Sequence, residues 1–197
     1  NVDANTIGTY SITYNVTDAA GNAAAEVTRT VNVVDTLPPV ITLNGDQNVD
    51  AEAGLPYTDP GAYAIDQNTN IILTDDIQVT GSVNTSVVGT YELKYNVTDS
   101  EGNVADEVIR TVNVQDTIAP VISLIGSSTV QIHVGGTYDD DGATANDSFD
   151  GDLTNFIDTT NNVDESNTGI YYVTYNVTDE VGNAATTVVR TVNIVDQ

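Results

Sequence analysis

Apolar and polar residues alternate along three pairs of short segments in this chain. In the central pair, residues 91–97 (Tyr-Glu-Leu-Lys-Tyr-Asn-Val) and 108–114 (Val-Ile-Arg-Thr-Val-Asn-Val) place apolar side chains at every second position, except that Arg110 takes one of these positions. This period of two is typical of a β-strand with one buried face. The intervening Asp-Ser-Glu-Gly-Asn at 99–103 favours a tight turn, because Asp bonds its own backbone and Gly and Asn tolerate positive φ. The pattern therefore predicts a β-hairpin.

The hairpin pattern occurs three times and ends each time on an aspartate. The closing residues Asp35, Asp116 and Asp196 lie 116 − 35 = 81 and 196 − 116 = 80 residues apart. A period of this size predicts tandem domains. We expect Ig-like repeats at 36–116 and 117–197, and the C-terminal part of a truncated repeat at 1–35. An isolated hairpin is marginal in water, so residues 1–35 are a window on a longer array, the interpretation we favour, or are completed by another chain.

Each complete repeat begins with a Pro-rich, stiff linker, and a strand pattern follows at 40–43 and 121–124. A tight turn leading into a strand with small inward alanines is expected within 57–66 and 138–147, and further strands at 77–83 and 157–163. No segment has a convincing helical period. About seven short strands per repeat, with frequent turn signals, predict an all-β fold of tandem antiparallel Ig-like sandwiches.

Composition narrows the possible functions. The 197 residues include no Cys, Met or Trp and one His, and the formal net charge is −25. Disulfides and thiolate or multi-histidine metal sites are therefore excluded. The chain also lacks the clustered Lys and Arg residues that bind nucleic acid or anionic membranes. No apolar run is long enough for a membrane span or signal peptide, so we expect a mature soluble segment. With the Thr/Asn/Val-rich repeats, this composition favours an extracellular or cell-surface protein of bacteria or archaea.

The order of short motifs resembles a known family. Pro-Val-Ile-Thr-Leu (39–43), Tyr-Thr-Asp-Pro-Gly-Ala (57–62), Tyr-Asn-Val-Thr-Asp-x-x-Gly-Asn (95–103) and Arg-Thr-Val-Asn-Val (110–114) are similar to the bacterial immunoglobulin-like repeats of the pesticidal-crystal-protein type. These are related to hyalin and cadherin-like modules. Such modules occur in adhesins, stalks and secreted hydrolases alike. The resemblance implies a spacer or adhesion role and no catalytic residues.

Acidic residues gather where an Ig-like topology brings loops together. The chain entry, the loop after the second strand and the last hairpin turn share one pole of such a sandwich. We therefore expect each closing aspartate to meet acids of the following repeat, which are oxygen ligands suited to Ca²⁺. The alternative is that these acids only shape turns. The Asp-Gly-Asp at 150–152 favours Ca²⁺ at the 116/117 junction over the 35/36 junction. The candidate ligands are Asp116, Asp147, Asp150, Asp152 and Asp179 at the former, and Asp35, Asp66 and Asp99 at the latter.

A second recurring set is assigned to the fold. One arginine per hairpin falls on the apolar phase of its strand, where its stem can cover the core edge while the guanidinium meets a carboxylate. The arginines are Arg29, Arg110 and Arg190, and the core-facing tyrosines of the hairpins include Tyr91, Tyr95, Tyr171 and Tyr175.

The favoured function is a non-catalytic spacer or stalk of an extracellular adhesin or surface fibre, stiffened by Ca²⁺ at its junctions. Two alternatives stay open. The chain could be an accessory, carbohydrate-binding module of a secreted hydrolase, or a filament subunit assembled by strand complementation. The expected partners are neighbouring repeats and, in a fibre, identical chains; a glycan or host-surface ligand is compatible with the sequence, and neither nucleic acid binding nor membrane insertion is expected.

Overall fold

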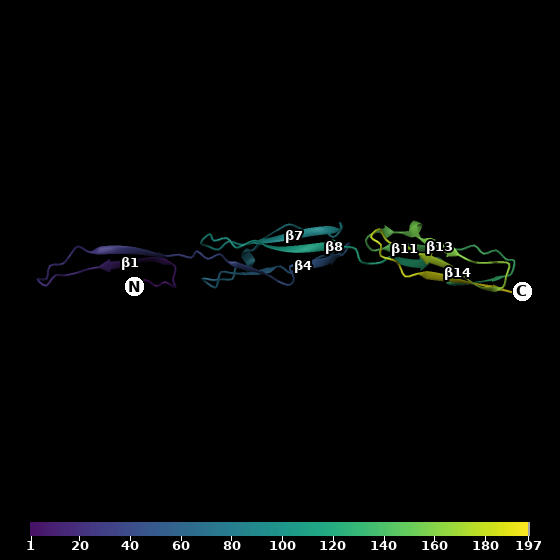
Figure 1. Cartoon of the computed structure of the whole chain (residues 1–197), viewed down its shortest axis with the longest axis horizontal. Coiled ribbons are helices and arrows are strands. Elements are labelled where there is room, and N and C mark those ends of the chain that lie inside the picture. Colours follow the sequence, from purple (N-terminus) through teal and green to yellow (C-terminus); the bar gives the residue numbers. More distant parts are fainter. Residues whose placement is uncertain (197) are drawn as a thin grey trace. The chain divides into compact units, whose positions relative to one another are not determined.

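The computed structural model describes residues 1–196, which form β-strands and two short 3₁₀ helices (Figure 1). None of these residues lies in an α-helix, and none lies in a helix long and apolar enough to cross a membrane. The chain divides into two compact units. The N-terminal unit contains Asn1–Gln47, Asp59–Gly81 and Glu92–Arg110; the C-terminal unit contains Asn48–Thr58, Ser82–Tyr91 and the chain from Thr111 onward.

The N-terminal unit consists of short antiparallel pairs. The first hairpin joins β1 and β2, with Tyr10 opposite Val31. Strand β3 pairs with β5, and β6 pairs with the end of β7. The elements are β1 (Gly8–Tyr14), β2 (Val27–Val33), β3 (Val40–Leu43), β5 (Ala62–Ile65), the 3₁₀ helix η1 (Thr74–Asp76), β6 (Gln78–Thr80) and, from Glu92 onward, β7 (Gly89–Asn96).

The C-terminal unit contains the whole third repeat as two sheets. One sheet has the order β12-β11-β9 and the other has the order β10-β15-β14-β13. The unit also contains β4 (Asn48–Glu52), which pairs with the second half of β8 (Val108–Gln115). The remaining elements are β9 (Val121–Leu124), β10 (Thr129–His133), β11 (Ala143–Asp147), β12 (Gly151–Asp152), the 3₁₀ helix η2 (Thr154–Phe156), β13 (Asp158–Asn161), β14 (Gly169–Asn176) and β15 (Val188–Val195).

The predicted all-β, Ig-like class is confirmed, with one difference in strand direction. Strands β4 and β8 are parallel, and so are β10 and β15, with Val130 opposite Val192. The cause is a jog in the first strand of each repeat. Gly45 (φ 79°) and Gly126 (φ 80°) adopt positive φ, a conformation that glycine allows without steric cost. The chain thereby leaves the sheet of β3 or β9 and continues beside the last strand of the repeat.

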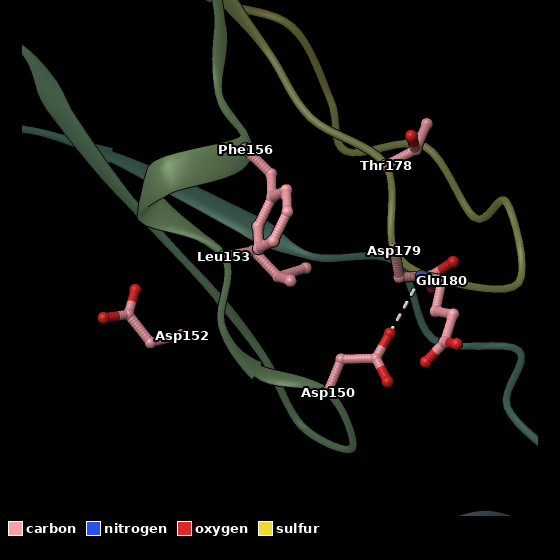
Figure 2. Close-up of a pocket in the computed structure, with 7 residues that line it drawn as sticks. All are labelled: Asp150, Asp152, Leu153, Phe156, Thr178, Asp179 and Glu180. Atoms are coloured by element: carbon pink, nitrogen blue, oxygen red, sulfur yellow. Dashed lines mark hydrogen bonds between the residues drawn. The ribbon is translucent and has the colours of Figure 1, made fainter.

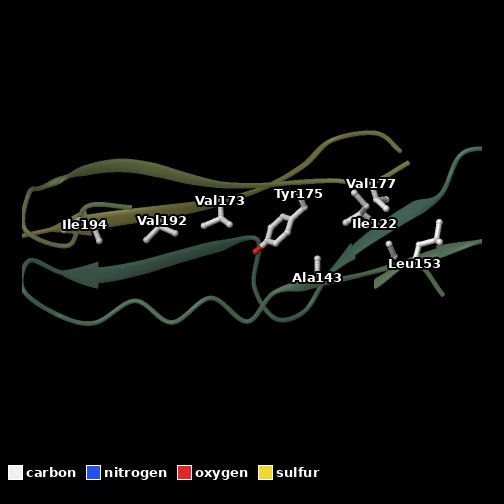
Figure 3. Packing of buried hydrophobic residues seen from close by; sticks show 9 residues of the cluster. Ile122, Ala143, Leu153, Val173, Tyr175, Val177, Val192 and Ile194 are labelled. Atoms are coloured by element: carbon white, nitrogen blue, oxygen red, sulfur yellow. The ribbon is translucent and has the colours of Figure 1, made fainter. Parts of the chain in front are cut away.

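The core of the third repeat lies between its two sheets (Figure 3). The inward positions of β14 and β15 are almost completely buried, with Val173 and Val192 at 0% and Tyr175 at 1% exposure. Alanines of β11 face them, and their small side chains leave room for the tyrosine ring. The other buried members are Ile122, Ala143, Ala145, Leu153, Val177 and Ile194.

A buried arginine connects the two layers of the third repeat. Arg190 is 0% exposed, and its guanidinium forms an ion pair with Asp140. It also donates hydrogen bonds to three backbone carbonyls, including those of Ser127 (3.0 Å) and Gly142 (3.0 Å). Tyr175 donates to the other oxygen of Asp140 (2.5 Å). Because the charge is paired and its donors are used, the burial of the guanidinium is compensated.

The same arrangement recurs in the N-terminal unit. Arg110 is 0% exposed, pairs with Asp59, and donates to the carbonyls of Asn44 (2.6 Å) and Asp46 (3.1 Å). In the first hairpin, Arg29 is exposed and lies 5.8 Å from the centre of the Tyr14 ring. The hairpin tyrosines also differ from one another. Tyr95 and Tyr175 are core residues, whereas Tyr91 and Tyr171 are half-buried and donate their hydroxyls to the carbonyls of Val87 (2.8 Å) and Asn167 (3.1 Å).

The pairing of Asp140 makes stability depend on pH. Burial raises the pKa of Asp140, but the hydrogen bonds from Tyr138 and Tyr175 and the charge of Arg190 outweigh burial, so the pKa is lowered. A lowered pKa in the folded state stabilises the protein above the unfolded pKa of about 3.9, and this contribution is lost as the pH falls through the folded pKa.

We therefore expect Asp140→Asn to reduce the free energy of unfolding by about 3 kcal/mol at pH 7, since it leaves Arg190 buried and unpaired. The difference from wild type should shrink as the pH falls below about 4. Urea unfolding over this pH range measures the difference. Asp139→Asn, which changes the exposed neighbour, is the control. An unchanged difference across the range would contradict the assigned role of Asp140.

Candidate metal centre

Three carboxylates come together at the 116/117 junction. Asp116 directly follows β8, and one carboxylate oxygen each from Asp116, Asp150 and Asp179 lies within 4.8 Å of the others. Oδ1 of Asp116 accepts a hydrogen bond from the backbone N–H of Ile118 (3.3 Å). Oδ2 of Asp116 is buried, and no donor among residues 1–196 reaches it. An unpaired buried carboxylate oxygen is costly, so this group has an unmet need for a cation or a proton.

The hairpin turn after β14 holds Asp179 in this group. Oδ1 of Asp179 accepts hydrogen bonds from the N–H groups of Gly182 and Asn183 (2.7 Å each), and Oδ2 accepts one from Nδ2 of Asn183 (2.7 Å). Gly182 permits this turn because it adopts φ 100°. Asn183 also donates to the backbone carbonyl of Asp116 (3.2 Å). The turn thus fixes Asp179 beside the closing aspartate of the preceding repeat.

The loop between β11 and β12 supplies the third carboxylate. Oδ1 of Asp147 accepts the N–H groups of Phe149 (2.7 Å) and Asp150 (3.1 Å), an Asx turn that shapes the loop. Oδ2 of Asp147 is buried without a partner among the described residues. Asp150 accepts the N–H of Glu180 (2.9 Å), as Figure 2 shows. The loop is therefore attached to the hairpin turn through Asp150.

The charges in this group oppose one another. Burial raises the pKa of Asp116, and the nearby carboxylates of Asp147, Asp179 and Asp150 raise it further against the hydrogen bond from Ile118. Like charges at such distances disfavour full ionisation unless a cation is present. The surrounding ligands are oxygens, which hard cations such as Ca²⁺ prefer. The chemistry this arrangement supports is cation binding.

A cavity of about 410 Å³ opens next to the carboxylates. Its lining combines acids with apolar surface: Leu153 is 8% exposed, whereas Phe156 is 70% exposed (Figure 2). The remaining lining residues are Asp150, Asp152, Thr178, Asp179 and Glu180.

A second group of acids occurs at the 35/36 junction, within the N-terminal unit. Carboxylate oxygens of Asp35, Asp99 and Glu101 lie within 4.8 Å of one another. Oδ2 of Asp35 is buried without a partner among the described residues, while Oδ1 accepts the N–H of Leu37 (2.9 Å). Asn103 contacts the carbonyl of Asp35 (3.4 Å), as Asn183 does with Asp116. Both junctions therefore share the same turn.

The carboxylate of Asp66 accepts hydrogen bonds at both oxygens, unlike that of its counterpart Asp147. The hydroxyl of Thr69 and the N–H of Asn68 (2.8 Å) both donate to the Asp66 carboxylate. The hydrogen bond from Thr69 is the largest of the effects that lower the pKa of Asp66. Its charge is therefore already stabilised by the protein, which leaves less need for a cation at this junction than at 116/117.

The structure thus places the candidate ligands unequally. Asp116, Asp150 and Asp179 gather, and Asp147 lies close enough to influence Asp116. Asp152 stays outside this group; it is exposed and accepts the N–H of Thr154 (3.0 Å). Glu101 joins Asp35 and Asp99 but is absent from the expected ligand set. The signal for it was present, since Glu101 lies within the same acidic turn as Asp99.

The repulsion among these carboxylates predicts an effect of neutralising one of them. Asp116→Asn removes one charge and keeps an oxygen that can accept the Ile118 N–H. In chelator at pH 7, we expect this variant to unfold at a higher urea concentration than wild type. The expected gain is about 1 kcal/mol, the Coulomb energy of like charges about 4 Å apart at the dielectric constant of water.

The exposed Asp152 provides a matched control, and Asp152→Asn should leave the urea midpoint within about 0.5 kcal/mol of wild type. If Asp116→Asn destabilises the protein in chelator, the carboxylates are not in conflict.

The two-layered repeats, their buried arginine–aspartate pairs and their recurrent hairpin define a tandem Ig-like module protein. A sequence profile described as "Bacterial surface protein, Ig-like domain" matches residues 1–33, 41–114 and 122–194. The chain belongs to this family of bacterial surface protein Ig-like domains.

Relatives with assigned names share the repeats. The chain is 34% identical to hyalin of Lytechinus variegatus over 208 residues, covering 97% of the chain and 37% of that hyalin. It is 31% identical to the pesticidal crystal protein Cry22Aa of Bacillus thuringiensis over 191 residues, covering 92% of the chain and 25% of that protein. It thus spans well under two thirds of these relatives. A solved structure of the M60 catalytic domain with the CBM51-1 and CBM51-2 domains from Clostridium perfringens ZmpB aligns with a TM-score of 0.49 at 15% identity, covering 100% of the chain and 34% of that structure.

Proposed function

We propose that this chain is a non-catalytic, extracellular spacer segment whose 116/117 junction binds Ca²⁺. One observation carries the proposal: Asp116, Asp150 and Asp179 lie within 4.8 Å of one another, and Oδ2 of Asp116 is buried without a donor. Charge balance supports it as well. The chain has four Lys and Arg against 29 Asp and Glu, and Arg110 and Arg190 are used inside the fold.

The ligands would be carboxylates of Asp116, Asp147, Asp150 and Asp179. A bound Ca²⁺ supplies positive charge that converts the repulsion among these groups into attraction. Because Asp116 ends the second repeat and the other three belong to the third, the ion connects the two repeats. The function is then mechanical: the junction resists bending while Ca²⁺ is present. The 35/36 junction, where Asp66 is already stabilised by hydrogen bonds, would bind Ca²⁺ more weakly.

An extracellular spacer of an adhesin or surface fibre agrees with the family, whose description is that of bacterial surface proteins. Calcium at extracellular concentrations can saturate sites with dissociation constants of about 10⁻⁴–10⁻³ M. A large negative charge also keeps such segments soluble and separate from one another.

Calcium titration tests the proposal. At a free Ca²⁺ concentration of about 100 times the dissociation constant, the free energy of unfolding should rise by about 2.7 kcal/mol over its value in chelator. Asp116→Asn should lose most of this increase, and Asp152→Asn should keep it. Calorimetry measures binding and differential scanning calorimetry measures stability. Superimposable melting curves of the wild type in calcium and in chelator would contradict the proposal.

Carbohydrate binding is a second candidate function, favoured by the cavity beside the junction. The exposed ring of Phe156 offers a platform for the apolar face of a sugar, while Asp152 and Glu180 can accept hydrogen bonds from its hydroxyls. A glycan array probed with the full chain, in calcium, tests this function. Hits that disappear in Phe156→Ala would support it, and an array without hits would exclude it for the glycans displayed.

A further inference from the structure

The loop that contributes Asp150 to the junction also carries an aromatic residue with a separate contact. Phe149 precedes Asp150, and the N–H groups of both donate to Oδ1 of Asp147. Phe149 packs against a cluster of buried residues from the second repeat, Ala53 (0% exposed), Val112 (0%) and Val114 (1%). All of these residues lie within the C-terminal unit. A side chain of the third repeat thus completes an apolar cluster of the second.

The surface that receives Phe149 is built from small and rigidly held residues. The N–H of Ala53 donates to the carbonyl of Gln115 (2.9 Å), and that of Gly54 donates to Thr85 (2.8 Å). Gly54 adopts φ 74°, and a β-carbon at this position would lie 3.6 Å from Cδ2 of Phe149. The ring therefore lies directly over this glycine. The half-buried rim of the surface consists of Ala51, Tyr57, Val83 and Tyr91.

We propose that this surface, the aromatic socket (Ala53, Gly54, Val112 and Val114), recognises Phe149 and holds the third repeat on the end of the second without a metal ion. The compact units support this inference. Ala53 and Gly54 lie in Asn48–Thr58, and Val112 and Val114 lie in the chain from Thr111 onward. Both of these pieces of the second repeat group with the third repeat and not with the rest of their own. The partner that fits the socket is a loop with an aromatic residue two positions after an Asx-turn aspartate.

The corresponding loop of the second repeat shows that the turn does not require an aromatic residue at this position. Oδ1 of Asp66 accepts the N–H of Asn68 (2.8 Å), as Oδ1 of Asp147 accepts that of Phe149 (2.7 Å). The same turn therefore presents an exposed Asn68 at one junction and a packed Phe149 at the other. We infer that the residue at this position determines whether a junction has a metal-independent apolar contact.

The variant Phe149→Asn tests the socket, because it transplants the residue of the other junction and retains the N–H that Asp147 needs. The full chain is studied in excess chelator, so that the result does not depend on calcium binding. In wild type, the methyl groups of Ala53, Val112 and Val114 should show nuclear Overhauser effects to the Phe149 ring and ring-current shifts. In Phe149→Asn these shifts should be lost. The melting temperature of the C-terminal unit should fall by about 4–8 °C, the shift expected for about 1 kcal/mol in a domain of this size.

Phe156→Asn is the matched control, since Phe156 belongs to the same repeat but is 70% exposed; it should change neither the methyl shifts nor the melting temperature. A second variant, Ala53→Val, fills the socket and should reproduce the loss of Phe149 contacts while circular dichroism shows retained β-structure. Absence of Phe149 effects on these methyl groups in wild type would overturn the proposal, whether or not Phe149→Asn folds. So would a melting temperature equal in wild type and Phe149→Asn.

Discussion

A single buried guanidinium in each complete repeat is the interaction on which this structure depends. In the third repeat, Arg190 pairs with Asp140 and donates to the carbonyls of Ile125 and Ser127, on either side of the jog that follows β9. It thereby ties the last strand of one sheet to the loops of the other. A lysine could not replace it, because the planar guanidinium supplies several fixed donors where an ammonium is a point charge.

This use of arginine has a consequence for the rest of the chain. Two of the four Lys and Arg residues are buried within the fold, and the formal net charge is −25. None of the ion pairs found among residues 1–196 involves a junction carboxylate. At 116/117 the conflict is strongest, since Asp116 and Asp147 each bury an oxygen that no described donor satisfies. Carboxylates without a positively charged partner thus lie close together where one repeat meets the next.

Much of this arrangement can be read from the sequence. The alternation at 91–97 and 108–114 predicts the hairpin strands, and the placement of Arg110 on the apolar phase predicts a guanidinium that meets a carboxylate. The meeting of Asp116 with Asp150 and Asp179 follows from the topology of an Ig-like sandwich. These inferences depend on local periodicity and on loops that share one pole.

Other features depend on tertiary geometry that periodicity does not encode. The parallel pairing of β10 with β15 follows from the positive φ of Gly126, one glycine among many in the sequence. Asp152 has the spacing of a ligand, yet it accepts the N–H of Thr154 and stays outside the group. Phe149 reads as an isolated loop aromatic, because its partners lie in strands distant along the chain. Sequence reasoning therefore locates the junction. It does not show which residues form the carboxylate group or that Phe149 makes a separate apolar contact.

The two junctions differ in the contacts that their loop side chains make. Both use an aspartate to shape the loop after the second strand, and both use an asparagine of the hairpin turn to contact the closing aspartate. The two turns are therefore the same at both junctions, and the side chains that they carry differ. At 35/36 the loop aspartate is satisfied by Thr69, whereas at 116/117 Asp147 keeps a buried free oxygen and Phe149 packs on the preceding repeat. Because the same turn carries different side chains at the two junctions, the loop residues distinguish the contacts that each junction makes.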